Sequence, residues 1–214
     1  MSSLVQITPE ISYIPATHKP FTCDVIFIKT RKATWIFDVG MSREQADYIN
    51  SIEGPKNVVL SHFHPDHILN LPKVKYDQLF VSANTRKYTF KGTVVKEPLV
   101  FDEEPQIRIY EMPSSHAKGC LCLVCGDYAF MGDGTYCKEK LHNHTYNTQL
   151  LKAEIDFLQS LNCQYVCLDH DQHFIQNREA LIDLHKDIYN RHKPGEPTIS
   201  VEDFFNADGS VKQE

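Results

Sequence analysis

The sequence lacks several features that define whole classes of protein. No stretch approaches the roughly 18 consecutive apolar residues of a transmembrane helix. Residues 1–20 show no basic segment followed by an apolar core, as a secretory signal peptide would. No internal repeat, low-complexity segment or interdomain linker is visible. We therefore expect a cytoplasmic protein that does not contact a membrane.

Basic charge is also scarce. The 22 Lys and Arg residues are outnumbered by 28 Asp and Glu residues, which gives a net charge of −6 without a long run of either sign. A general basic surface for nucleic acid is therefore disfavoured, although a local positive site formed by bound metal is not. We expect a small-molecule substrate and no nucleic-acid partner.

The chain has seven cysteines, an odd number, and no visible secretory signal, so we expect reduced thiols rather than disulfides. The spacing of Cys120, Cys122 and Cys125 would also suit a second metal site or a redox pair. These residues lie, however, in a short apolar run that ends at Gly126-Asp127, a hairpin signal. We interpret them as small buried side chains of a strand.

With 214 residues, 42% of them apolar, the chain is long enough to bury the core of one domain. Strands are predicted at 24–30, 33–38, 57–60, 78–82, 92–101, 106–111, 120–125, 128–131 and 164–168. Their order with the helices predicts sheet layers covered by helices on the outside. We assign residues 1–195 to one domain and 196–214 to a polar tail, which either docks on the body or forms a homodimer contact.

Three longer helices are predicted from capping residues and apolar spacing. Ser42 begins the first helix, and Gln45 completes a capping box. The second covers residues 148–161, and Asn177 caps the third, which Pro194-Gly195 ends. The expected inner faces are Ala46 and Ile49 in the first helix, Leu150, Leu151, Ile155, Leu158 and Leu161 in the second, and Leu181, Leu184 and Ile188 in the third.

The run Ser61-His62-Phe63-His64-Pro65-Asp66-His67 carries the clearest chemistry. His62 and His64 are two residues apart, so in an extended segment both imidazoles point the same way and can reach one ion. Pro65 suits the first position of a helix, which places Asp66 and His67 in its first turn, facing a neighbouring position. One loop after a strand thus offers ligands to two divalent ions, and imidazole and carboxylate suit zinc and other first-row metals.

A His-x-His-x-Asp-His run after a strand resembles the signature of the metallo-β-lactamase superfamily. Four further residues match that family's pattern in order: Asp38 in Trp-Ile-Phe-Asp-Val-Gly, His116 in Ser-Ser-His-Ala-Lys-Gly, Asp133 in Phe-Met-Gly-Asp-Gly and His170 in Cys-Leu-Asp-His. The resemblance covers about residues 26–171. It implies an α/β (α+β) fold, the four-layer αβ/βα sandwich of that superfamily.

The resemblance also implies a dinuclear site. The first ion would be held by His62, His64 and His116, the second by Asp66, His67 and His170, and Asp133 would bridge the two. We expect two divalent ions, zinc first and iron or manganese as alternatives. Asp38 would support the loop rather than bind metal. Ser115 and Asp169 stand where the family usually has Gly; we interpret Asp169, and equally Asp171, as a partner for an imidazole N–H.

The function implied is that of a metal-dependent hydrolase, in which a metal-bound hydroxide attacks a carbonyl ester, lactone or thioester. Asp66 or Asp133 would orient the hydroxide and pass a proton to the leaving group. Tyr136, three residues after Asp133, is similar to a tyrosine that polarises the substrate carbonyl in the quorum-quenching N-acyl homoserine lactonases of the superfamily. His142 and His144 follow in the next loop, either bordering the pocket or simply solvated.

Other functions stay open at this point. Some superfamily members bind a single iron and oxidise a persulfide, and the ligands of the first ion do not separate that dioxygenase activity from hydrolysis. A phosphodiesterase is a further alternative, as is a metal-binding protein without catalysis. We expect the hydrolase because the ligand set is complete.

Overall fold

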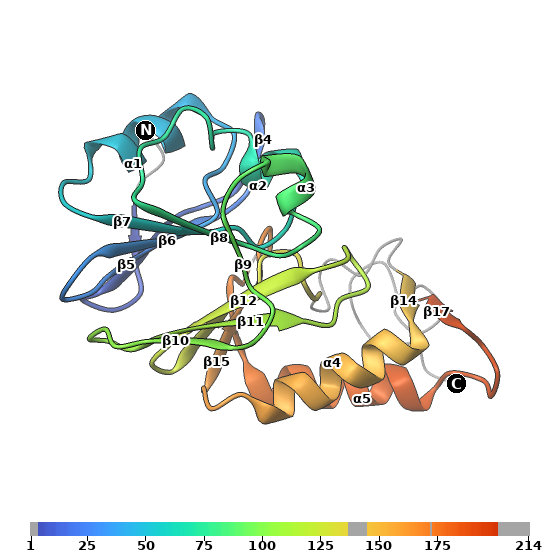
Figure 1. The fold of residues 1–214 in the computed structure, drawn as a ribbon. Helices are drawn as coiled ribbons and strands as arrows, with labels where there is room; N and C mark the ends of the chain where they lie inside the picture. Colours follow the sequence, from blue (N-terminus) through green and yellow to red (C-terminus); the bar gives the residue numbers. More distant parts are fainter. Residues whose placement is uncertain (1–3, 137–144, 172, 201–214) are drawn as a thin grey trace.

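A computed structural model describes residues 4–136, 145–171 and 173–200, and two sheets dominate it (Figure 1). The first sheet has the order β1-β2-β5-β6-β7-β8-β9. Its strands are β1 (Val5–Gln6), β2 (Ile11–Ile14), β5 (Val25–Lys29), β6 (Thr34–Phe37), β7 (Lys56–Val59), β8 (Gln78–Val81) and β9 (Thr93–Val94). The strands up to β6 pair antiparallel, and β6, β7, β8 and β9 pair parallel.

The second sheet has the order β10-β11-β12-β13-β15-β16. Its strands are β10 (Leu99–Phe101), β11 (Ile107–Met112), β12 (Cys120–Cys125), β13 (Tyr128–Phe130), β15 (Tyr165–Cys167) and β16 (Ile175–Asn177). Only β13 and β15 pair parallel. Two short antiparallel pairs complete the described strands: the hairpin of β3 (Thr17–His18) with β4 (Phe21–Thr22), and the long-range pair of β14 (Thr145–Asn147) with β17 (Thr198–Ser200).

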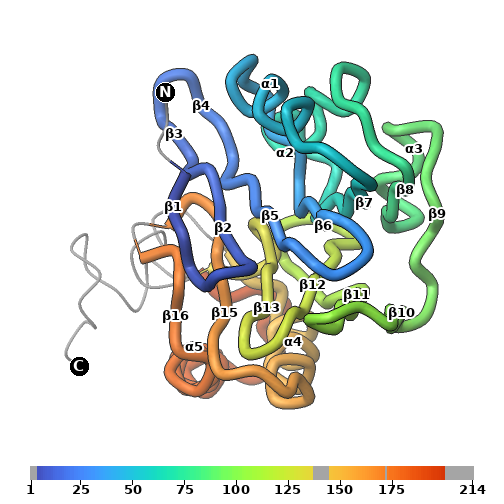
Figure 2. The backbone as a smooth tube through the Cα atoms, turned by 90° about the vertical axis from the view of Figure 1, so that its left-hand side faces the viewer, coloured from blue at the N-terminus to red at the C-terminus, as the bar shows by residue number. Residues whose placement is uncertain are grey.

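Helices cover the outer face of each sheet, which gives four layers (Figures 1 and 2). The first sheet carries α1 (Arg43–Ser51), α2 (Pro65–Ile68) and α3 (Arg86–Thr89); the second carries α4 (Thr148–Ser160) and α5 (Arg178–Asn190). The predicted α/β sandwich, with sheets inside and helices outside, is therefore confirmed. Among the described residues, no helix is long and apolar enough to cross a membrane.

The layers are held together by three apolar clusters. One lies between the sheets and includes Trp35 and Phe37 from the first and Leu121 and Leu123 from the second, all essentially inaccessible to solvent. The other two lie between each sheet and its helices. A sheet buried on both faces explains why the central strands read as continuous apolar runs.

Strand β12 shows what its cysteines do. All six of its residues are buried. Cys120 and Cys122 pack in the cluster under α4 and α5, whereas Cys125 packs in the cluster between the sheets. Successive residues of a strand point to opposite faces, so Cys122 and Cys125, three residues apart, lie on different faces and share no site. The interpretation of this run as strand packing is confirmed, and the cysteines of the described residues are free thiols.

Most predicted elements are confirmed, including the Ser42 capping box and the hairpin across Gly126-Asp127. Residues 92–101, expected as one strand, are instead two: β9 belongs to the first sheet and β10 to the second. The chain crosses between the sheets at 95–98, where Pro98 has no N–H to donate to a ladder. The domain boundary at residue 195 stays a prediction, and residues 198–200 of the expected tail pair with β14.

The inner faces of the two C-terminal helices differ in part from expectation. Leu150, predicted inside, is 38% exposed, because the buried face of α4 is centred on Leu151, Ile155 and Leu158. Leu184 is half-buried. Each of these faces instead carries one buried ionisable residue that the apolar pattern did not predict, Glu154 in α4 and His185 in α5.

The capping box of α1 generates a stability prediction. Ser42 Oγ accepts the Gln45 main-chain N–H at 3.2 Å, so Ser42→Ala leaves an N-terminal donor of the helix without its partner. We expect the free energy of unfolding, measured by urea denaturation, to fall by about 1 kcal/mol. The control Ser160→Ala, the same change at the exposed last residue of α4, should change it by less than about 0.5 kcal/mol. Equal losses in the two variants would contradict the cap.

Candidate metal centre

The predicted site residues gather at one edge of the sandwich because of strand direction. Strands β6 and β7 are parallel neighbours, so Asp38 and the histidine run, which follow them, leave the first sheet side by side. Strands β13 and β15 do the same in the second sheet, which places Asp133 beside His170. His116 enters from the connection between β11 and β12. Five chain segments distant in sequence therefore meet at the carboxyl ends of parallel strands, where sites of α/β proteins are commonly found.

The histidine run has the predicted local structure. His64 is extended, with φ −67° and ψ 148°, and Pro65 occupies the first turn of α2. Asp66 and His67 follow in that turn and are both buried. The start of the loop is held by the main chain, since Leu60 N–H donates to the Phe80 carbonyl at 3.0 Å and Leu121 N–H donates to the Ser61 carbonyl at 2.7 Å.

Two sets of potential ligands lie at this edge. One atom from each of His62, His64, His116 and Asp133 lies within 4.8 Å of the others. The second set, within the same limit, consists of Asp66, His67, Asp133 and His170. Asp133 belongs to both. The structure thus brings together all seven residues that the resemblance assigned, in the predicted two groups, with the predicted shared carboxylate.

Within the first set three ring nitrogens face one another. His116 Nε2 lies 3.2 Å from His62 Nε2 and 3.0 Å from His64 Nδ1. His62 Nδ1 is 2.9 Å from Ser61 Oγ, and His116 Nδ1 is 2.7 Å from the Tyr136 hydroxyl, so the outward nitrogens of these two histidines are already partnered. Nitrogen lone pairs converging at such distances repel unless a cation lies among them, which is the arrangement of a metal site.

Within the second set, His170 Nε2 is 3.0 Å from Asp66 Oδ2. His67 Nε2 is buried without a hydrogen-bond partner among the described residues, although it lies 3.3 Å from Asp66 Oδ2 and 3.5 Å from Asp133 Oδ2. A buried polar nitrogen without a partner costs free energy, and a divalent ion between the imidazoles and carboxylates would satisfy it. The donors of both sets, neutral imidazole and carboxylate, fit zinc and related ions.

Asp38 supports the loop, as expected of it. Its Oδ1 accepts the Ser61 main-chain N–H at 2.7 Å, and its Oδ2 lies 2.8 Å from His67 Nδ1. The bond to Nδ1 leaves Nε2 of His67 directed at the second ligand set. Asp38 has φ +62°, an uncommon value outside glycine. His170, with φ +56°, is the second such residue at this edge, and strained backbone of this kind is typical of functional sites.

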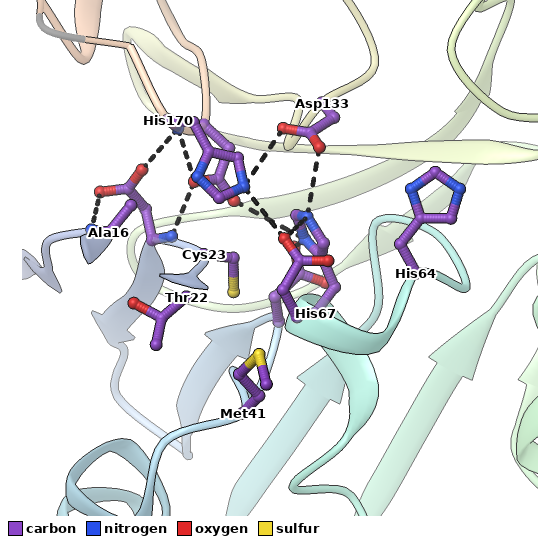
Figure 3. A network of polar contacts seen from close by, with 12 residues as sticks. Ala16, Thr22, Cys23, Met41, His64, His67, Asp133 and His170 are labelled. Carbon is purple, nitrogen blue, oxygen red and sulfur yellow. Dashed lines mark hydrogen bonds and ion pairs between the residues drawn. The ribbon is translucent and has the colours of Figure 1, made fainter. Parts of the chain in front are cut away.

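Asp169 and Asp24 hold the loop that carries His170, and Figure 3 shows His170 beside Asp133. The His170 main-chain N–H lies 2.7 Å from Asp169 Oδ1 and 2.9 Å from Asp24 Oδ2, and Asp169 Oδ1 also accepts the Asp24 N–H at 2.7 Å. Asp169 Oδ2 lies 3.6 Å from His67 Nδ1, beyond hydrogen-bond range. Asp169 therefore accepts from two main-chain N–H groups, and its role as an imidazole partner stays a prediction that the ion pair with His67 supports. Asp171 Oδ1 accepts the His173 N–H at 2.8 Å.

Glycine at position 132 allows the two halves of the site to approach. Gly132 precedes Asp133 and has φ +56°. A Cβ at this position would lie 2.7 Å from Ser61 Oγ, the side chain that contacts His62 and His67. Any side chain here would separate Asp133 from the histidine run.

The local electrostatics favour the protonation states that a metal needs. Burial, reinforced by the charge of His67, lowers the pKa of His62 to about 2, and burial also lowers the pKa of His64. For Asp66 and Asp133, burial pushes the pKa upward, but contacts with His170 and His67 outweigh it and hold the pKa of each well below its usual range. The imidazoles of His62 and His64 are therefore neutral and both carboxylates ionised near neutral pH, as metal ligands must be.

His67 differs from the other histidines. Burial disfavours its charged form, but the charge of Asp38 outweighs this and raises the pKa of His67 well above its usual value. The carboxylates therefore create a negative potential that draws positive charge to this position. Cys23, Asp38, His67 and Asp169 form a further buried group of potential ligands. Because His67 Nδ1 is already bonded to Asp38, we interpret this group as support for the second ligand set.

Tyr136 lies at the site, with its hydroxyl on His116, and is buried. His142 and His144 lie outside the described residues. Sequence reasoning missed Asp24, Ser61 and Phe21, whose exposed ring stacks on His170 with centroids 4.5 Å apart. Of these three residues, Ser61 alone had a signal in the sequence, because it is the first residue of the histidine run.

Comparison with known proteins agrees with this geometry. Residues 18–93, which include the histidine run, match the model of the Metallo-beta-lactamase superfamily. No curated protein matches the chain significantly. Among similar solved structures is a metallo-β-lactamase from Pontibacter korlensis, with 15% identity and a TM-score of 0.63 over 89% of this chain and 99% of that one.

Two further structures show how widely the fold is used. A metallo-β-lactamase superfamily protein from the archaeon Sulfolobus tokodaii has 17% identity and a TM-score of 0.59, covering 89% of this chain and 90% of its own. A chemotaxis sensor called ODP, described as a peroxy diiron species, has 12% identity and a TM-score of 0.65, covering 87% and 93%. Likeness at these identities concerns the fold, and neighbours with different metal chemistry share it.

The two ligand sets predict about two divalent ions per chain, measured by mass spectrometry on protein purified without added metal or chelator. His116→Ala removes a donor that belongs to the first set alone, so the content should fall to about one. His192→Ala is the matched control, because His192 contacts Tyr189 away from both sets, and it should keep both ions. Wild-type protein without bound metal, or an unchanged content in His116→Ala, would refute the two-ion site.

Proposed function

We propose that this chain, which has the metallo-β-lactamase fold, is a dinuclear metal-dependent hydrolase of carbonyl esters, lactones or thioesters. The observation that carries the proposal is the sharing of Asp133 between two complete ligand sets, each within 4.8 Å. A shared carboxylate holds two ions close to each other, as hydrolytic two-metal sites require. Further support comes from His62, Asp66 and Asp133, which near neutral pH have the protonation state of metal ligands.

When bound, ions such as zinc supply Lewis acidity and make water acidic enough, with a pKa of about 7, to be deprotonated at neutral pH. The chain therefore needs no Ser/His/Asp triad. Asp66 and Asp133 are ionised carboxylates beside the reaction space and accept and return a proton. Asp66 is held for this by His170, whose Nε2 lies 3.0 Å away.

Tyr136 has two roles in this proposal. His116 presents Nε2 to the first ligand set, so Nδ1 carries its proton and donates it to the Tyr136 oxygen at 2.7 Å. Burial raises the pKa of the Tyr136 phenol, so the hydroxyl keeps its own hydrogen at neutral pH. That hydrogen suits a substrate carbonyl, the role that the resemblance to the lactonases implies. Tyr136 both orients a ligand and polarises the substrate.

A cavity beside His116 supports a substrate with an apolar part. Its volume is about 740 Å³, and its walls come from the 111–119 segment and from Leu150 and Ala153 of α4. His116 belongs both to this cavity and to the first ligand set, so an acyl chain in the cavity would bring its carbonyl to the ions. We therefore favour esters, thioesters or lactones with a medium-length acyl chain.

The other functions are outcomes of the same experiments. One iron per chain with oxygen-dependent turnover of a persulfide would replace hydrolysis by sulfur oxidation. Cleavage of phosphodiesters but not of carbonyl substrates would make the chain a phosphodiesterase, and bound metal without turnover would leave a binding protein. Our proposal also keeps a cytoplasmic location, a small-molecule substrate without nucleic acid, and a homodimer contact through the tail.

Asp66→Ala tests the hydrolytic role. The variant loses a ligand and a proton acceptor, so kcat on lactone, ester and thioester substrates should fall roughly 100-fold or more. Far-ultraviolet circular dichroism should be unchanged, because α2 keeps its other residues. The control Asp156→Ala removes an exposed carboxylate of α4 and should keep full activity. Full activity of Asp66→Ala would rule out the dinuclear mechanism.

Ala153→Phe tests the acyl cavity. The larger side chain fills part of the volume beside His116 and displaces part of a long acyl chain into water, which costs about 0.8 kcal/mol per CH₂ group. KM should therefore rise roughly tenfold for decanoyl substrates and stay constant for acetyl substrates. Lys152→Phe, the same new side chain at the neighbouring exposed position, should change neither value. An equal rise for both chain lengths would place the acyl group elsewhere.

A further inference from the structure

Beneath the metal centre, α4 and α5 enclose a pair of ionisable side chains that the proposed reaction does not use. Glu154 and His185 are both fully buried, and Glu154 Oε1 lies 3.6 Å from His185 Nδ1. Each occupies the apolar face of its helix, where leucine or isoleucine would be the stable choice. Burying such a pair costs desolvation free energy, so its retention calls for an explanation beyond packing.

The contacts of His185 assign its hydrogen. Nε2 lies 3.3 Å from the Tyr136 carbonyl oxygen, 3.2 Å from Thr135 Oγ1 and 3.4 Å from the Tyr146 hydroxyl. A carbonyl oxygen can only accept, so Nε2 carries the hydrogen and donates it toward Tyr136. In the neutral ring, Nδ1 then presents a lone pair to Glu154. A protonated Glu154 carboxyl facing that lone pair is the arrangement without repulsion.

These contacts lead to the metal centre in two short steps. Thr135 and Tyr136 follow Asp133 in the same loop, and His185 touches both. The Tyr136 side chain then reaches His116, with 2.7 Å between the hydroxyl and Nδ1. One residue is therefore held at its carbonyl by α5 while its hydroxyl orients a ligand of the first set. Tyr146 packs against both rings, with centroids 5.8 Å from Tyr136 and 5.7 Å from His185.

We infer that Glu154 and His185 are positioning residues, which fix the 133–136 loop from below and act on the first ligand set through Tyr136. The inference rests on the proposed function for its effect on turnover, but its effect on metal binding does not depend on any reaction. The pair orients the His185 N–H, that N–H holds the Tyr136 main chain, and the Tyr136 hydroxyl holds His116. An error in the loop position would therefore appear as weaker metal binding.

Charge at the pair agrees with this geometry. Burial raises the pKa of Glu154 to about 8, which the Thr135 hydroxyl partly opposes, and burial lowers the pKa of His185 to about 4. Besides Glu154, the titratable residues whose hydrogen-bond contacts with His185 are resolved in the described part of the chain are Tyr136 from the loop and Tyr146 from β14. Burial, Asp133 and Glu154 raise the pKa of Tyr136, so it does not titrate near neutrality. Near pH 7 the pair therefore consists of a protonated acid and a neutral imidazole.

The test is a double-mutant cycle between His185→Phe and Tyr136→Phe, read out as the dissociation constant for Co²⁺ and as the visible spectrum of the Co²⁺-loaded protein. Each single change should weaken binding at the first ligand set roughly 10- to 100-fold. Because His185 acts through Tyr136, the double variant should bind Co²⁺ no more weakly than the single variant with the lower affinity. The inference would be overturned if the loss of Co²⁺ affinity in the double variant equalled the product of the two single losses. It would also be overturned if His185→Phe left the Co²⁺ affinity and spectrum unchanged.

Two further variants distinguish a specific effect on metal binding from a general loss of stability. His185→Gln keeps an N–H donor and should recover most of the Co²⁺ affinity lost in His185→Phe. Ile188→Ala opens a cavity one turn further along α5, where it destabilises the fold without removing a hydrogen bond to the loop, and should leave the spectrum and affinity as in wild type. A shift of the spectrum in Ile188→Ala equal to that in His185→Phe would reduce the pair to ordinary packing.

Glu154→Gln separates the proton from the shape. The raised pKa of Glu154 gives stability that is complete below its unfolded value of 4.5 and is lost as pH rises through about 8. The lowered pKa of His185 gives stability that is complete above its unfolded value of 6.5 and is lost as pH falls through about 4. Between pH 6.5 and 8, Glu154 is the one member of the pair that makes the free energy of unfolding depend on pH. The free energy of unfolding, measured by urea denaturation at saturating metal, should therefore fall across this window in wild type relative to Glu154→Gln. Parallel pH dependences of the two proteins would show that Glu154 is not protonated in the folded state.

Kinetic measurements distinguish failure of the proposed hydrolytic function from failure of the positioning role. If wild type hydrolyses none of the ester, lactone or thioester substrates but the Co²⁺ cycle shows coupling, the proposed function fails and the positioning role stands. If wild type hydrolyses them and His185→Phe matches it in kcat and Co²⁺ affinity, the function stands and the positioning role is wrong.

Discussion

The structure depends on bringing polar groups that repel one another into one partly buried place. Imidazole nitrogens of three histidines lie about 3 Å apart, and next to them Asp66 and Asp133 remain ionised although burial opposes their charge. Among the described residues Nε2 of His67 makes no hydrogen bond, although carboxylate oxygens of Asp66 and Asp133 lie 3.3 and 3.5 Å away. The free energy needed to assemble them comes from the apolar clusters above and below, and a divalent ion would relieve the repulsion.

Support for this assembly is distributed over both sheets. Asp38 holds the histidine run from the first sheet, and Asp169 with Asp24 holds the His170 loop from the second. Asp38 and His170 have positive φ values, so the backbone itself is strained where these loops leave their strands. Gly132 removes the side chain that would keep the two sheets apart at this edge. The same rigid edge that positions the ligands therefore also limits how far they can relax apart.

The sequence was most informative where the chemistry is contiguous. His62, His64, Asp66 and His67 lie within six residues, so their spacing and the preceding strand were enough to predict one loop offering ligands to two ions. His116, Asp133 and His170 came from the resemblance, because a single histidine or aspartate carries no spacing of its own. Contacts such as that of Asp24 with His170, 146 positions apart, depend on how strands pair, which local pattern does not report.

The same limit explains the errors in the fold. The apolar pattern of residues 92–101 is that of strand, but it does not say that β9 and β10 belong to different sheets. Leu150 satisfies helical spacing but is 38% exposed, because the buried face of α4 includes Glu154, a polar position that the apolar pattern does not mark.

Glu154 and His185 make a physical connection between the layers that the apolar pattern of their helices does not show. In an apolar helix face a buried acid or imidazole lowers stability, and local pattern alone gives no reason to keep it there. Its reason becomes visible only when α5 is placed under the 133–136 loop, where His185 meets the carbonyl of the residue whose hydroxyl touches His116. The outer helices of the second sheet then do more than cover it, because the packing of α4 against α5 sets where a ligand of the metal centre lies. Stability and site geometry are coupled through the same two side chains, and a change that improves the packing of these helices should be expected to alter the centre above them.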